Sequence, residues 1–218
     1  MNFQNDLNNS NNNGNLRKIF IYDNSIIASI FSVTKFHEQI IEKLNINSII
    51  ELGIKSGNIV LLENIVDLIA FYLNKNNIES LNEILDKIIS LIDKCIKNKN
   101  CSVSLMTKIF QLISVLYSND NTVKNEKIEN LKIIESININ FKKFSHDYDY
   151  IYSSLNCLVI IIKNNEKLTE ECFKSDLIKN IKIAINNYVK EIPPNYTLII
   201  WKVTEFYYLL LKSKKEMI

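Results

Sequence analysis

The chain has 218 residues, of which 47% are hydrophobic and 23% are charged, and its formal net charge is +2. This length and apolar content suit one sizeable globular core, and the small charge argues against a global basic field that would attract nucleic acid or acidic membranes. The sequence contains only three Gly and two Pro. Because β-sandwiches and doubly wound α/β domains need many turns built from these residues, their scarcity favours long helices.

Residues 1–15, MNFQNDLNNSNNNGN, are rich in Asn and poor in apolar side chains. Such a segment buries too little apolar surface to offset the entropy of ordering, so we expect a disordered tail. It lacks the basic region followed by an apolar stretch that a secretory signal would show. We therefore expect a cytoplasmic or nuclear protein in a reducing compartment.

Two consecutive helices are predicted between residues 58 and 98. In the second, apolar residues recur three and four positions apart from Leu81 to Ile96, and polar residues cover the opposite face. The first is apolar on most of its circumference and must be covered by neighbours. A nearly buried helix beside a half-exposed one is typical of stacked repeats, because each unit buries its face only against the next.

Further helices are predicted before and after this pair, over residues 47–55, 103–117, 128–143, 149–163, 172–190 and 195–212. Gly57 is expected to end the earliest of them in a left-handed conformation, and Asn58 to cap the next helix. Ser102 and Thr169 are expected caps further along.

A repeat connects these helices. Apolar helices begin near residues 58, 102, 149 and 195, a period of about 44 to 48 residues. Each has an apolar centre, such as Ile65-Val66-Asp67-Leu68-Ile69, and each is followed by a polar cluster. The amphipathic helices over residues 78–97, 128–143 and 172–190 alternate with them. The sequence therefore predicts successive helical pairs.

Two stretches carry a resemblance to a known family: SIIELGIKSGNIVLLENIVDLIAFYLNKN and YIYSSLNCLVIIIKNNEKLTEECFKSDLIKNIKI. Both resemble armadillo or HEAT-type repeats, in which the end of one helix and a short polar turn precede a long buried helix. The resemblance covers most of residues 25–215. It implies an all-α, right-handed superhelix of about four helical-pair units, with the domain spanning residues 16–218. It also implies a protein-binding scaffold whose groove lies along the amphipathic helices.

The candidate binding face follows from that resemblance and from the helical pattern. A peptide lying along the row of amphipathic helices would have its main chain and charges met by Asn, Asp, Glu and Lys side chains. The residues expected to be exposed on this face are Asn82, Asp86, Lys87, Asn130, Lys132, Glu135, Lys179 and Asn180.

The residues that could carry chemistry form no recognisable motif. The four cysteines, Cys95, Cys101, Cys157 and Cys172, include no C-x-x-C pair and are expected to be small buried hydrophobic residues. His146 lies beside Asp147, where an Asp is expected to cap the next helix. No glycine-rich phosphate-binding motif occurs. We expect a protein that is not an enzyme and uses no metal or cofactor.

The preferred function is binding another protein or peptide as a scaffold or adaptor. The alternative is an RNA-binding helical-repeat protein, which we favour less because lysines on the amphipathic helices are interleaved with acids and Asn. No membrane partner is expected, because the longest apolar stretch, residues 198–211, contains charges and is shorter than the roughly 20 residues that span a bilayer.

The last predicted helix, from Asn195 to Lys212, is more apolar than one contact face requires. Its aromatic residues, Trp201, Phe206, Tyr207 and Tyr208, are expected in the core or in a capping surface. Solenoid ends normally carry a polar outer face, which this helix lacks. We therefore expect it to dock a partner or a second copy of the chain, or to continue into a longer solenoid.

Overall fold

The computed structural model describes residues 45–75, 82–98, 100–117, 131–163, 165–189 and 196–216. The chain divides into two units, Met1–Ile46 and Asn47–Ile218, and nearly all described residues belong to the second. Every regular element in these ranges is a helix, which confirms the all-α class. The predicted tail over residues 1–15 lies outside them, as does the chain up to residue 44.

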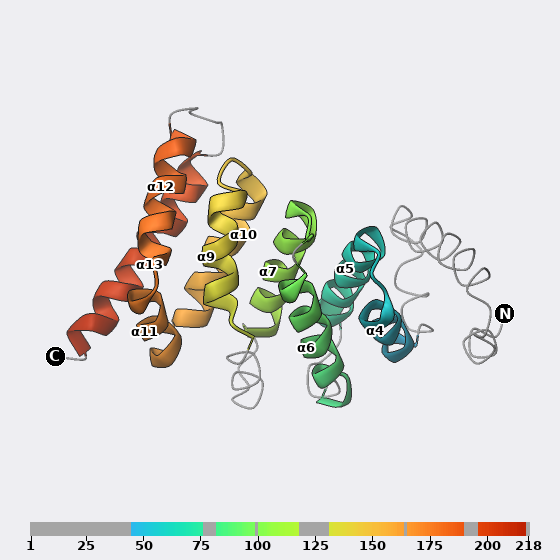
Figure 1. The fold of residues 1–218 in the computed structure, drawn as a ribbon. Helices are drawn as coiled ribbons and strands as arrows, with labels where there is room; N and C mark the ends of the chain where they lie inside the picture. The colour runs from blue at the N-terminus through green and yellow to red at the C-terminus, as the bar shows by residue number, and fades with distance from the viewer. Residues whose placement is uncertain are drawn as a thin grey trace. The chain divides into compact units, whose positions relative to one another are not determined.

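Figure 1 shows the helices in chain order. Their bounds are α4 (Ile46–Lys55), α5 (Ile59–Lys75), α6 (Asn82–Lys97), α7 (Val103–Tyr117), α9 (Ile133–Lys143), α10 (Tyr148–Ile162), α11 (Glu166–Lys174), α12 (Leu177–Val189) and α13 (Tyr196–Glu216).

Several helix starts agree with the sequence. The side chain of Asn58 accepts a hydrogen bond from the backbone N–H of Leu61 at 3.2 Å, and Ser102 accepts one from Leu105 at 3.0 Å. These side chains satisfy N–H groups that have no partner within the helix. Gly57 was expected in a left-handed conformation, but no described glycine has a positive φ. The α4–α5 turn instead uses Ser56, whose hydroxyl accepts from the Asn58 N–H at 3.0 Å.

Two predicted helices differ from the structure. The helix expected over 128–143 begins at Ile133, because Lys132 is in the left-handed region at φ 49° and stands at its N-terminus. The helix expected over 172–190 is two helices, α11 and α12, separated at residues 175–176. Ser175 is extended there, with ψ 163°. Thr169 is not a cap: it is buried inside α11, and Asn165 caps that helix by accepting from Leu168 at 2.9 Å.

The apolar helices pack in chain order. In the Asn47–Ile218 unit, α5 packs against α7, α7 against α10, and α10 against α13. Polar side chains join the same neighbours: Lys108 on α7 contacts Asp67 on α5 at 2.5 Å, and Gln111 donates to Ser153 on α10 at 3.2 Å. These helices contribute most of the core, as their apolar character predicts.

An aromatic cluster fills the junction of α7, α9 and α10. The buried ring of Tyr150 lies edge-on to Phe110, Phe141 and Phe144, with ring centroids 5.2 to 5.9 Å apart. Its hydroxyl donates to the Ile137 carbonyl oxygen at 3.3 Å, so the buried polar atom has a partner. Burial raises the pKa of Tyr150 well above its ordinary value. The cluster fixes α9 and α10 as a pair.

The amphipathic helices form the other side of the same unit. Figure 1 shows α9 in front of α10 and α12 in front of α13, and α12 packs against α9. On α6, the Lys94 ammonium donates to the carbonyl oxygens of Ile54 and Ser56 at the end of α4. A Cβ at Gly53 of α4 would lie 3.0 Å from the Leu91 side chain on α6, so glycine permits this close approach.

Candidate functional site

One of the three residues in the α6 part of the predicted face, Lys87, is engaged within the fold. Asp86 is exposed, as expected. Lys87 is half-buried, because its ammonium pairs with Glu51 on α4 at 2.6 Å. This hydrogen bond and the lysine charge lower the pKa of Glu51. Asn82 is the first residue of α6, and its side chain lies outside the described part of the structure. The lysine therefore joins α4 to α6 and is not a free binding group.

The α9 part of the face is solvent-facing. Lys132 and Glu135 are both exposed and form an ion pair of 3.4 Å at the start of the helix. Such exposed pairs contribute little to stability, about 0–1 kcal/mol, so both side chains can reach a partner at low cost. Asn130 lies outside the described residues.

The α12 part contains one correct and one wrong prediction. Lys179 is exposed as expected, but Asn180 is only 5% exposed. Asn180 shares the buried side of α12 with Leu177, Ile181 and Ala184. Its side-chain amide donates to Asn138 on α9 at 2.6 Å, which satisfies the polar group where it is buried. Asn180 therefore joins two helices and is unavailable to a partner.

The exposed side chains of α9 and α12 form a basic surface that also carries two isoleucines. We call it the α9–α12 surface, and its residues, with Lys132 just before α9, are Lys132, Glu135, Ile139, Lys142, Lys143, Lys179, Lys182, Ile183 and Asn186. Three of these lysines make no ion pair with another described residue: Lys142, Lys179 and Lys182. The acidic residue that precedes α12, Asp176, makes none either. The Lys143 ammonium lies 4.8 Å above the Phe144 ring. The surface thus has more positive charge than the chain as a whole.

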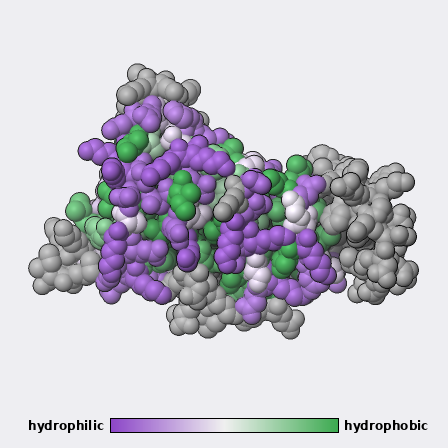
Figure 2. Space-filling model, in the orientation of Figure 1, coloured by the Kyte–Doolittle hydropathy of each residue, from purple (hydrophilic) through white to green (hydrophobic). Residues whose placement is uncertain are grey.

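Sequence reasoning missed the two isoleucines. Ile139 is 61% exposed on α9 and Ile183 is 48% exposed on α12. Each stands two positions after a buried isoleucine, Ile137 or Ile181, and two positions along a helix turn the side chain by about 200°. Figure 2 shows the visible face as mainly hydrophilic, with isolated hydrophobic patches over α9 and α12. The i, i+2 spacing was the available signal.

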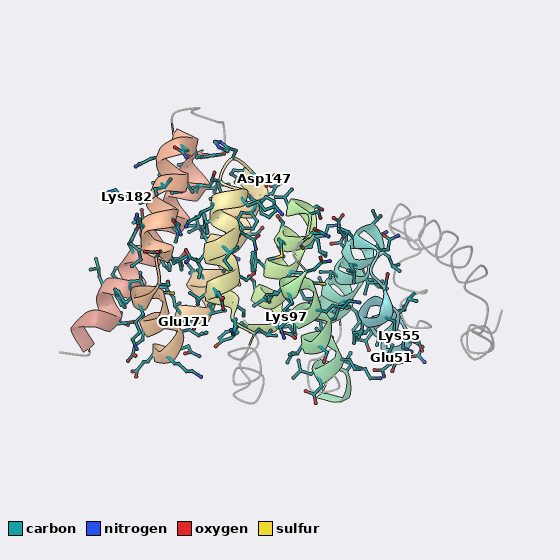
Figure 3. The ribbon with its side chains drawn as sticks, viewed as in Figure 1. Glu51, Lys55, Lys97, Asp147, Glu171 and Lys182 are labelled. Atoms are coloured by element: carbon teal, nitrogen blue, oxygen red, sulfur yellow. The ribbon has the colours of Figure 1, made fainter. Side chains whose placement is uncertain are left out.

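The charged side chains do not converge on one point. Figure 3 shows Glu51, Lys97, Asp147 and Lys182 spread from α4 to α12. Asp147 serves as the expected cap, accepting from the Tyr150 N–H at 2.8 Å. No group of three or more His, Cys, Asp and Glu that could hold a metal ion occurs among the described residues. Within these ranges the exposed side chains of α9 and α12 are the candidate binding surface.

The cysteines are all buried and reduced, as the sequence predicted. Desolvation raises the pKa of Cys95, Cys157 and Cys172 to about 12, and that of Cys101 to about 11. Only the thiolate is a nucleophile or a good metal ligand, so these thiols are inert at neutral pH in the folded chain.

The last helix exposes the apolar surface that its sequence indicates. Phe206 is buried and Tyr207 half-buried, but Trp201 and Tyr208 were expected in the core or in a capping surface and are 70% and 64% exposed. Leu198 and Leu211 are also more than half exposed. In the described part of the chain, no helix has the length and apolar character needed to cross a membrane.

Comparison of the chain with known protein families, with characterised proteins and with solved structures finds no match.

Proposed function

We propose that this protein is a non-catalytic scaffold that binds another protein or a peptide through the outer face of its amphipathic helices. In this proposal the helices form a right-handed superhelix of armadillo or HEAT type. The superhelix has about four units. They are the helical pairs α4–α5, α6–α7, α9–α10 and α12–α13, and α11 is an additional short helix.

The contacts between equivalent helices support a repeat. Glu63 accepts from Ser102 across 39 positions of sequence, and Asp67 pairs with Lys108 across 41. Gln111 with Ser153 and Asn138 with Asn180 are each separated by 42. In a solenoid each unit contacts only its neighbours, so contacts recur at a nearly constant separation. The recurrence favours a regular stack over an irregular helical bundle.

The observation that carries the binding proposal is the composition of the α9–α12 surface. Its lysines have no acidic partner among the described residues, apart from Lys132, which pairs with Glu135. Ile139 and Ile183 provide exposed apolar contacts beside these charges. A partner segment that carries both acidic and aliphatic side chains would complement both features. We therefore propose an acidic, amphipathic segment of another protein as the ligand.

RNA binding is the alternative, and the side-chain types argue against it. Arg17 is the only arginine in the sequence. Arginine provides the bidentate phosphate and base contacts, and the stacking, that nucleic-acid surfaces rely on. The exposed apolar residues of the α9–α12 surface are aliphatic and provide no stacking platform.

A displayed library of random short peptides, selected on the full chain, tests the proposal. We expect the selected peptides to be enriched in Asp and Glu interspersed with Leu, Ile or Val. The double variant Lys142→Glu/Lys182→Glu should weaken their binding about tenfold or more, because it turns attraction into repulsion. The matched control is Lys97→Glu/Lys174→Glu, which changes the charge equally at exposed lysines of α6 and α11.

Two outcomes would contradict the proposal. Peptides without acidic enrichment, or binding that both double variants reduce equally, would remove the α9–α12 surface as the site. Tight binding of a single-stranded RNA oligonucleotide, with a steep loss of affinity as salt rises, would favour the RNA alternative.

A further inference from the structure

We infer that α13 docks onto α13 of a second copy of this chain, as an antiparallel pair related by a two-fold axis. This interface is separate from the α9–α12 surface, so either assignment can fail without the other.

The helix α13 buries one side and exposes apolar residues on the other. Ile199, Phe206 and Leu210 are at most 2% exposed, and α13 packs mainly against α10 and α11. On the opposite side the exposed residues are Leu198 (51%), Trp201 (70%), Tyr208 (64%) and Leu211 (62%). Four of the eight large exposed hydrophobic residues of the described chain lie on this one helix. Exposed apolar side chains gathered on one side of a helix are typical of interaction sites.

The spacing of these four residues is symmetric about one point. Leu198 and Leu211 are equally far from the midpoint between Thr204 and Glu205, and so are Trp201 and Tyr208. A two-fold interface requires that if residue i contacts residue j of the other copy, then j contacts i. An antiparallel pair centred on this midpoint places Trp201 opposite Tyr208 of the second copy. It places Leu198 level with Leu211. The spacing therefore permits a two-fold antiparallel pair, and the occupant that we infer is a second copy.

The contacts across this axis are chemically compatible. Trp201 and Tyr208 are large rings with polar edges that can stay in water at the rim, which suits an interface. Glu205 is level with Thr204 of the second copy, so no two like charges face each other at the centre. The Glu205 carboxylate already pairs with Lys202 in its own helix at 2.9 Å. The helix dipoles oppose each other, as an antiparallel pair allows.

The first experiment uses the single tryptophan of the chain, which lies in the proposed interface. A contact made by one helix per copy is small, so we expect reversible pairing between about 1 and 100 micromolar chain. Sedimentation equilibrium should show the mass rising from 25.4 kDa towards twice that value over this range. Over the same range the Trp201 emission should shift to the blue, because most of the indole ring leaves water even if its polar edge stays at the rim.

A pair of variants links these changes to α13. Tyr208→Glu should hold the chain at the monomer mass and keep the Trp201 emission red-shifted at every concentration. Val60→Glu is the matched control: it places the same charge at another apolar side chain, 59% exposed on α5, and should dimerise like the parent chain. Equal behaviour of the two variants would overturn the inference. So would a parent chain that stays monomeric throughout the range, which would assign α13 to a different protein partner.

Cysteine cross-linking tests the geometry. Thr204 stands next to the axis, so Thr204→Cys should form a disulfide with its own copy under mild oxidation. The two Leu198 residues would be separated by 13 helical positions, about 20 Å, so Leu198→Cys should not cross-link to itself. The four native cysteines are buried and do not compete. Self-cross-linking of Leu198→Cys, or its absence in Thr204→Cys, would overturn the antiparallel arrangement.

Discussion

The side-chain amide of Asn180 on α12 donates to the amide oxygen of Asn138 on α9 at 2.6 Å. This hydrogen bond joins two amphipathic helices that are 42 positions apart, and Asn180 is nearly inaccessible to water. Because a buried amide without a partner costs free energy, the hydrogen bond stabilises one register of α12 against α9. The same contact thus sets the relative positions of the lysines and isoleucines on the α9–α12 surface.

Replacing Asn180 with Ala should lower the free energy of unfolding by about 1–3 kcal/mol, since Asn138 loses its partner and a small cavity remains. Urea denaturation followed by circular dichroism measures this loss. The Asn138→Ala change provides the second arm of a double-mutant cycle. If the two effects are additive in the double variant, the two amides do not interact in solution and the register argument is wrong.

A second prediction concerns the end of α4. The Lys94 ammonium donates to the carbonyl oxygens of Ile54 and Ser56, which have no partner within the helix. Lys94→Met keeps the aliphatic stem and removes these donors, so we expect a loss of about 1–2 kcal/mol in unfolding free energy. The control is Lys97→Met, which removes only an exposed pair with Asp93 and should cost about 0–0.5 kcal/mol. Equal losses would contradict the capping role.

A third prediction concerns the aromatic cluster. Tyr150→Phe keeps the ring packed against Phe110, Phe141 and Phe144 but removes the hydrogen bond to the Ile137 carbonyl oxygen. We expect a cost of about 1 kcal/mol, whereas Tyr150→Ala should cost about 3–5 kcal/mol because it also leaves a cavity. Thermal unfolding of both variants measures the two losses of stability and separates the contribution of the hydroxyl from that of the ring. A Phe variant as unstable as the Ala variant would mean that the hydroxyl, not the ring, holds α9 to α10.

The ends of the helices could be predicted from the sequence where they depend on residues close together in the chain. Asn58, Ser102 and Asp147 cap helices as predicted, because a cap depends on one side chain and the N–H group two or three positions later. The break at residues 175–176 could not be predicted in this way. The apolar periodicity continues through it, and Ser175 interrupts the helix without a Gly or Pro.

The candidate face could be predicted only in part. Lys132, Glu135 and Lys179 are exposed as their charge suggests, because burying an unpaired charge is costly. Asn180 is buried because a neutral amide can be satisfied by another side chain, here Asn138, and its partner is 42 positions away. Ile139, Ile183 and Trp201 are exposed although they are apolar. Whether a neighbour covers such a side chain depends on the tertiary arrangement, which periodicity does not encode.

The last prediction concerns the buried thiols and high pH. Burial raises the pKa of Cys95, Cys157 and Cys172 from 9.0 to about 12, and that of Cys101 to about 11. Above pH 9 the unfolded chain therefore releases these protons while the folded chain keeps them. Since the unfolded state then binds fewer protons, the contribution of these thiols to the free energy of unfolding should be constant at neutral pH and fall as pH rises through 9 towards 12. Urea midpoints at pH 8, 9 and 10 measure this loss of stability, and Cys157→Ala should reduce its dependence on pH.

A second experiment measures the reactivity of the thiols. In the folded chain at pH 8, a thiol-specific disulfide reagent should react slowly, and all four thiols should react at once in denaturant. Rapid reaction of the folded chain, or a midpoint that rises above pH 9, would contradict the burial of these thiols.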